Sequence, residues 1–170
     1  KTERLFGFVH DSIKTNVESD EVDDAGTILK HGRCDAWWKN ALLTALLGSR
    51  DIPAHLLLIG RRDRNGDFNP LHNDPSELDY LLCLAGPDDG GMPLDARAEF
   101  VFYPRVPSYC LVNRGLVIDG DSVHTISLRE PEWKNGSDVI STVWIQPSGS
   151  AVCTTSVRVY GCAIEQYKEF

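Results

Sequence analysis

The stretch GRCDAWWKNALLTALL (residues 32–47) predicts a buried helix that follows closely after a cysteine. Leu and Ala dominate its second half and favour helix, and GSRD (48–51) supplies a helix end. The first turn of a helix offers unpaired backbone N–H groups and the positive end of its dipole, and both favour a thiolate. Cys34 is therefore the first candidate nucleophile, although a buried free cysteine is often only a packing residue.

The segments on either side of this stretch predict an α+β fold. Upstream, Leu5, Phe8, Val9, Ile13 and Val17 recur at spacings of three and four, which is typical of one face of an amphipathic helix. Downstream, short β-prone runs are separated by Gly, Pro, Asn and Asp; they are IPAHLLLIGRR (52–62), ELDYLLCLAG (77–86), GMPLDA (91–96), SYCLVN (108–113) and GLVIDG (115–120). We expect helices packed on an antiparallel sheet.

The last third of the chain reads as purely β. HTISLRE (124–130) is followed by ISTVWIQPSGSAVCTTSVRVYG (140–161), in which PSG indicates the turn of a hairpin. We therefore predict a core in residues 1–120 and a β-rich extension, or the start of a second β domain, in residues 121–170.

Composition excludes two classes of partner for this piece of chain. The formal net charge is −8, and no run of Lys or Arg concentrates positive charge, which argues against nucleic acid. The longest apolar runs are far shorter than the roughly 20 residues that a membrane span needs, so we expect none. There is no initiating Met and no signal-like segment, so Lys1 is expected to mark a fragment boundary.

No cofactor and no metal are expected. The five cysteines (34, 83, 110, 153 and 162) are odd in number and lack CxxC spacing, so at least one thiol is unpaired and no zinc framework is indicated. DRNGDFNPLHND (63–74) alternates Asp and Asn as a calcium loop does, but it lacks the Glu that closes such a loop.

Three of these segments, in this order, resemble the transglutaminase-like, papain-related superfamily. GRCDAW (32–37) resembles its nucleophile segment, IPAHLLLI (52–59) the strand after the nucleophile helix, and PLDAR (93–97) the segment with the acidic member of the triad. LVNRGLVIDGDSVHTISL (111–128) and GSAVCTTSVRVYGCAIEQYKEF (149–170) resemble the exit into a C-terminal β domain, as in bacterial multidomain proteins with flanking β-rich domains. The resemblance implies a transglutaminase-like core and a location in the bacterial cell envelope or periplasm.

The same resemblance implies a Cys-His-Asp triad, in which an imidazole takes the thiol proton and a carboxylate orients the imidazole. Two features of this sequence depart from the pattern of the superfamily. The position of the histidine falls on Tyr80, and a phenol with a pKa near 10 is a poor base at neutral pH. The helix and the next strand also lie two residues too far from Cys34, so a gapless match puts Ala36 at the nucleophile position. Asp95 keeps the acid position, where it could equally be a turn residue.

The remaining candidate residues each have a second interpretation. His72 could be a relocated base in the loop before Tyr80, or a solvated loop histidine. Trp37 and Trp38 could line a substrate slot together with Tyr80, or fill the core. His55 is expected to be a neutral, hydrogen-bonded core histidine.

Two functions remain open. The first is a degenerate, non-catalytic transglutaminase-like domain that binds a peptide, a glycan or neighbouring domains of the same polypeptide. The alternative is an active cysteine hydrolase or acyltransferase of protein amides, with Cys34 as nucleophile, His72 as an unusual base and Asp95 as the orienting acid. Tyr80 in place of histidine favours the first.

Overall fold

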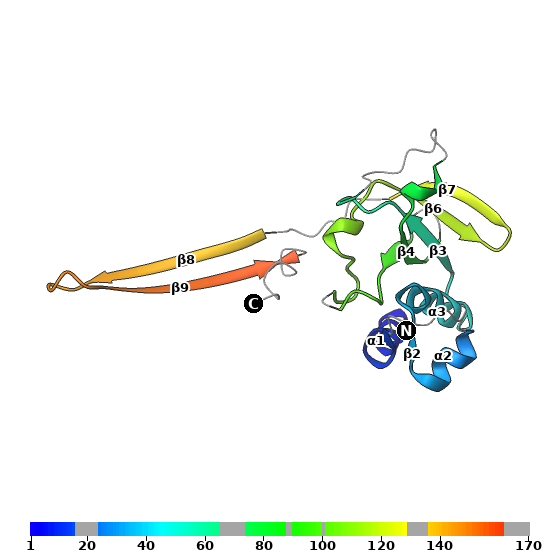
Figure 1. Cartoon of the computed structure of the whole chain (residues 1–170), viewed down its shortest axis with the longest axis horizontal. Helices are drawn as coiled ribbons and strands as arrows, with labels where there is room; N and C mark the ends of the chain where they lie inside the picture. Colours follow the sequence, from blue (N-terminus) through cyan, green and yellow to red (C-terminus); the bar gives the residue numbers. More distant parts are fainter. Residues whose placement is uncertain (16–23, 65–73, 88–89, 100, 129–135, 162–170) are drawn as a thin grey trace. The chain divides into compact units, whose positions relative to one another are not determined.

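The computed structural model describes residues 1–15, 24–64, 74–87, 90–99, 101–128 and 136–161. The chain divides into two compact units, residues 1–130 and 131–170, which are treated separately below (Figure 1). No helix among the described residues is long and apolar enough to cross a bilayer.

Three helices open the first unit: α1 (Thr2–Ser12), α2 (Ala25–His31) and α3 (Ala36–Gly48). The buried face of α1 differs from the predicted one, because Phe6 is buried while Phe8 is 44% exposed. Phe6 stacks on the ring of His10 and meets Tyr103, so Phe6 rather than Phe8 joins Val9 and Ile13 on the buried face. Val9 and Ile13 are buried as predicted, whereas Val17 lies outside the described residues.

Between these helices lies a short parallel pair of strands, β1 (Lys14–Thr15) and β2 (Arg33–Cys34), in which Thr15 lies opposite Cys34. Gly32, which caps α2 with a positive φ of 64°, leads the chain into β2.

Five strands form one antiparallel sheet in the order β5-β4-β3-β6-β7. They are β3 (Ala54–Ile59), β4 (Tyr80–Ala85), β5 (Met92–Leu94), β6 (Arg114–Asp119) and β7 (Ser122–Ser127). The predicted α+β class is thereby confirmed. Of the predicted strands, SYCLVN is wrong, because Ser108–Cys110 forms the short 3-10 helix η2; a second, η1, spans Pro75–Glu77.

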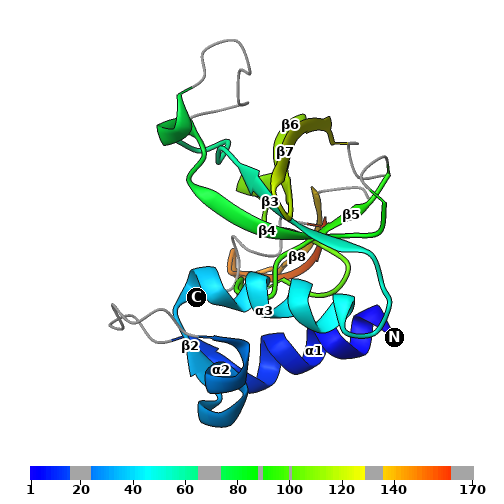
Figure 2. The ribbon, with the colours of Figure 1, turned by 90° about the vertical axis from the view of Figure 1, so that its right-hand side faces the viewer.

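The sheet separates two clusters of buried side chains. On one side, α3 packs against β3 and β4, and α1 packs on α3 (Figure 2). The apolar residues of both helices join Cys83, Ala85 and Leu94 in one cluster. On the other side, Leu57, Tyr80 and Leu82 pack with residues of the segment 106–112, among them Cys110. β4 is buried along its whole length because both faces are covered.

The predicted boundary after residue 120 differs from the division of the structure at residues 130 and 131. The reason is β7, which pairs with β6 over six residue pairs and completes the core sheet. Residues 122–127 therefore belong to the first unit.

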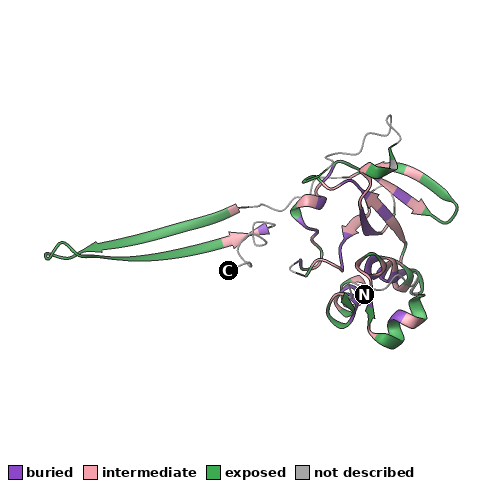
Figure 3. Cartoon of the chain, in the orientation of Figure 1, coloured by how far each residue is buried: buried purple, intermediate pink, exposed green. Residues whose placement is uncertain are grey.

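The second unit contains the predicted hairpin, formed by β8 (Gly136–Ile145) and β9 (Ala151–Tyr160). Its turn is closed by hydrogen bonds between Gln146 and Ser150 and between Gly149 and Gln146. Gly149 takes the positive φ of 86° that this turn requires. Nearly all residues of both strands are exposed (Figure 3).

Candidate functional site

Helix α3 begins at Ala36, two residues after Cys34. Asp35 is its N-cap, and the Asp35 carboxylate accepts a hydrogen bond from the Trp37 backbone N–H at 2.8 Å. Asp at this position stabilises a helix start because it satisfies a donor that has no partner within the helix. The first residue of α3 is thus Ala36, the position that the gapless match gives to the nucleophile.

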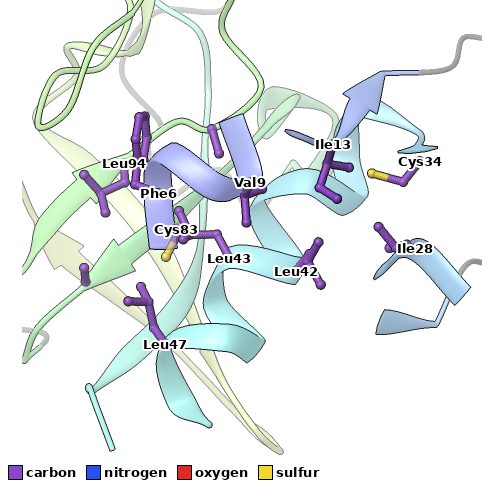
Figure 4. Packing of buried hydrophobic residues seen from close by; sticks show 12 residues of the cluster. Phe6, Val9, Ile13, Ile28, Cys34, Leu42, Leu43, Leu47, Cys83 and Leu94 are labelled. Carbon is purple, nitrogen blue, oxygen red and sulfur yellow. The ribbon is translucent and has the colours of Figure 1, made fainter. Parts of the chain in front are cut away.

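Cys34 is 1% exposed and belongs to the apolar cluster beneath the helices. Its sulfur points toward Ile13, with Ile28 on the neighbouring helix (Figure 4). This environment matches the packing interpretation of Cys34. Tyr80 belongs to the other cluster, across the sheet.

Asp95 and Tyr80 come together at one end of β4 and β5. Asp95 follows β5 directly and is fully buried. The Tyr80 hydroxyl donates to Asp95 Oδ2 at 2.6 Å. Asp95 Oδ1 accepts from Asn40 Nδ2 at 2.8 Å and from the Arg97 backbone N–H at 3.2 Å. Both carboxylate oxygens are therefore engaged by neutral donors.

Asn40, Arg97 and Tyr109 belong to this cluster although the sequence analysis did not identify them, and Asn40 is the most deeply buried of the three. It lies in the first half of α3, is fully buried, and donates also to the Leu81 carbonyl at 2.9 Å. Its own Oδ1 accepts from the Ala96 backbone N–H at 2.8 Å. The available signal was an amide within the apolar run AWWKNALLTALL, since a buried Asn requires partners from elsewhere in the fold.

Tyr109 extends the cluster beyond Tyr80. Its hydroxyl lies 3.1 Å from that of Tyr80, and the two rings meet edge to face. Because Tyr80 gives its single proton to Asp95, the proton in this second bond comes from Tyr109. Donation thus runs in one direction, from Tyr109 through Tyr80 to Asp95.

Two arginines flank the tyrosine pair. The guanidinium carbon of Arg97 lies 3.5 Å from the centre of the Tyr80 ring, and that of Arg61 lies 5.0 Å from the centre of the Tyr109 ring. Arg61 is also paired with Asp63 at 3.0 Å and with Asp79 at 3.8 Å.

The protonation equilibria of the site follow from burial. Burial raises the pKa of Asp95, an effect that the hydrogen bonds from Tyr80 and Asn40 oppose. Burial raises the pKa of Tyr80 far above its usual value, and the neighbouring Asp95 raises it further. Burial also raises the pKa of the nearby Cys110 thiol. Neither the phenol nor the thiol supplies a base or a thiolate at neutral pH.

Lys39, next to Asn40 on α3, carries a buried amine. Its side chain is 4% exposed, and its Nζ donates to the His10 carbonyl at 3.2 Å. Burial lowers the pKa of Lys39, and electrostatic interactions with Cys34 and Asp95 oppose this shift. This amine lies in the helical layer rather than over the tyrosines.

The other predicted site residues are dispersed. His72 lies outside the described residues. Trp37 is 41% exposed, while Trp38 is half-buried against the helical cluster. His55 is half-buried on β3, with its Nδ1 3.4 Å from Asp119. Among the described residues, no group of His, Cys, Asp and Glu is arranged to hold a metal ion.

The cluster of Asn40, Tyr80, Asp95, Arg97 and Tyr109 is therefore well built but contains no imidazole and no ionised thiol. Its side chains can hold a ligand by hydrogen bonds and by the positive charge of Arg97. Comparisons of the chain with protein-family models, with curated proteins and with solved structures found no match.

Proposed function

We propose that this chain is a degenerate transglutaminase-like domain that does not catalyse acyl transfer and serves as a binding or structural module. Its partner would be a peptide, a glycan or neighbouring domains of the same polypeptide. The observation that carries the proposal is the state of Asp95, whose carboxylate is occupied by Tyr80 and Asn40 where a triad would hold an imidazole.

The start of α3 supports the same conclusion. A nucleophile of this superfamily acts from the first turn of the helix, and that turn begins with Ala36. Cys34 precedes it, is 1% exposed and belongs to the apolar cluster of the helices, with Lys39 as an electrostatic neighbour. The resemblance also makes the bacterial cell envelope or periplasm the proposed location.

Thiol reactivity and turnover test this proposal together. The background is Cys153→Ser, because Cys153 is an exposed thiol on β9 that would dominate any labelling. Iodoacetamide at pH 6, followed by peptide mapping, should leave Cys34 unmodified in the folded chain, since its sulfur is enclosed. Glutamine-amide and simple peptide substrates should not turn over.

The opposite result would support the cysteine hydrolase or acyltransferase with Cys34, His72 and Asp95. This opposite result would be rapid alkylation of Cys34 at pH 6 together with amide turnover. Loss of turnover in Cys34→Ser would identify Cys34 as part of a working triad, and its loss in His72→Ala would do the same for His72.

A further inference from the structure

Arg97 is held in position from both ends. Its backbone N–H donates to Asp95 Oδ1 at 3.2 Å, and its guanidinium carbon lies 3.5 Å from the centre of the Tyr80 ring. Stacking of this kind orients a guanidinium while leaving its N–H groups free at the edge of the plane. Tyr80 is itself fixed by its bond to Asp95.

No residue in the described part of the chain accepts a hydrogen bond from the Arg97 guanidinium or lies within ion-pairing distance of it. The nearest carboxylate, Asp95, uses Oδ2 for Tyr80 and Oδ1 for Asn40 and the Arg97 backbone. The side chain of Arg97 is half-buried, so part of it reaches solvent. Its five donors therefore have no acceptor among the described residues.

Arg61 gives an internal comparison. It lies beside the same tyrosine pair, yet Asp63 and Asp79 neutralise it. Of these two arginines, Arg97, which lies directly over Tyr80, has no direct ion pair within the described residues; its charge acts on Asp95 from beyond ion-pairing distance and opposes the rise that burial causes in the pKa of that carboxyl. An oriented, unpaired guanidinium matches a carboxylate, which accepts two parallel N–H bonds from its planar fork.

The residues that follow Arg97 in the chain favour a peptide as the source of that carboxylate. Phe102, five residues after Arg97, is 61% exposed, and its carbonyl accepts a turn hydrogen bond from the Arg105 backbone N–H. A cation and an exposed aromatic side chain on one short segment match a carboxylate next to an apolar residue, as a peptide provides.

We propose that Arg97, stacked on Tyr80, binds the carboxylate of a peptide ligand. The carboxylate belongs either to the C-terminus of the peptide or to an acidic side chain. This inference rests on the proposed function as a binding module and names the ligand class for the same cluster.

The test follows the Arg97 Nε–H resonance by NMR in the full 170-residue chain. The probes are N-acetyl-phenylalanine, which carries a terminal carboxylate, and N-acetyl-aspartate α-amide, which carries a side-chain carboxylate. N-acetyl-phenylalaninamide is the uncharged match of the first probe, and galacturonate supplies a carboxylate on a sugar.

At least one of the two peptide-like carboxylates should shift the Arg97 resonance saturably at millimolar concentration, whereas the amide should not. Which of the two binds more tightly identifies the source of the carboxylate. Arg97→Lys keeps the charge but loses the fork and should weaken binding about tenfold, while Arg97→Gln should abolish it. Arg50→Gln, a change at an exposed arginine after α3, should leave binding unchanged.

Three results would overturn the inference: no saturable shift with either peptide-like carboxylate, an equal response to the amide, or tighter binding of galacturonate. Thermal unfolding of each variant shows that it is folded. These readouts are independent of Cys34, so the inference and the absence of catalysis can fail separately.

Discussion

At the scale of single residues, Asn40 joins α3 to the sheet. Its amide bonds the Leu81 carbonyl of β4, the Asp95 carboxylate and the Ala96 backbone N–H. All of these groups lie in the interior, where a polar atom without a partner is costly. Asn40 therefore decides whether the buried carboxylate can be accommodated.

Asn40→Leu should destabilise the chain by about 2–4 kcal/mol, since it leaves several buried polar atoms without partners. Urea unfolding monitored by tryptophan fluorescence measures the loss. Thr44→Val, one turn later on α3, removes a hydroxyl that bonds the Asn40 carbonyl, and it should cost less than about 1 kcal/mol. Equal costs for the two variants would contradict this role of Asn40.

Asp95→Asn should be tolerated far better than Asp95→Leu. An Asn at this position can still accept from Asn40 and from the Arg97 backbone, and its amide can donate to the Tyr80 hydroxyl. Tyr80 would then donate to Tyr109, so the direction of hydrogen bonding reverses without loss of a bond. We expect a cost of about 1 kcal/mol for Asn and about 3 kcal/mol or more for Leu.

The stability of the Asp95→Asn variant relative to wild type should change with pH in one direction. Because the pKa of Asp95 is raised in the folded chain, the folded state binds its proton more tightly than the unfolded state does. Wild-type stability therefore declines as pH rises from the unfolded pKa, near 3.8, through the folded pKa. The variant lacks this titration, so its stability relative to wild type should improve from pH 3 to pH 7. Urea unfolding at both pH values checks the sign.

At the scale of elements, the sequence correctly predicted the helices and strands in which the spacing of apolar residues matches the face that is buried in the structure. α3, β3, β4 and the β8–β9 hairpin all follow from apolar runs bounded by turn residues. In the remaining segments, contacts with distant parts of the chain set the structure and the local pattern did not. Phe6 replaced Phe8 on the buried face because Tyr103 meets it, and SYCLVN became η2 because Cys110 packs beneath β4. The partners of Asn40 and Tyr109 come from distant segments, which no local period can reveal.

The start of α3 leads to a prediction about rescue. An imidazole acting as general base contributes about 10²–10⁴-fold to such reactions, but misplacement of a reacting group by about 1 Å can cost on the order of 10²-fold. Cys34 precedes the helix by two residues. Tyr80→His alone should therefore leave turnover of glutamine-amide and simple peptide substrates undetectable.

The matched comparison is Ala36→Cys combined with Tyr80→His, which puts a thiol on the first residue of α3 in a chain that also carries the imidazole. Any gain in turnover should require this double variant. Steady-state turnover by Tyr80→His alone, abolished again by Cys34→Ala, would show that Cys34 already occupies a productive position.

At the scale of the whole molecule, the two units differ in how they bury apolar surface. The first contains two clusters of buried side chains on either side of a five-stranded sheet. The second contains a two-stranded hairpin with exposed faces, and an isolated hairpin is marginally stable at best in water. Stability of the chain should therefore reside in the first unit.

A fragment of residues 1–130 should unfold cooperatively, with a midpoint within a few degrees of that of the full chain. A peptide of residues 136–161 should show little β structure by circular dichroism at low concentration. A large loss of stability in the fragment would show that the hairpin contributes to the fold of the core.

The hairpin also governs how the protein behaves in solution. One of its faces carries Val139, Val143, Ile145 and Val157, all of them exposed, and its ten-residue strands leave their outer edges without a partner strand in the described chain. Its only charged residues, Asp138 and Arg158, lie opposite each other and cancel. Mutual repulsion between copies therefore comes from the acidic remainder of the chain, and it vanishes near the isoelectric point of about 5.0. Colloidal stability should be lowest there, with clouding that begins at the hairpin edges.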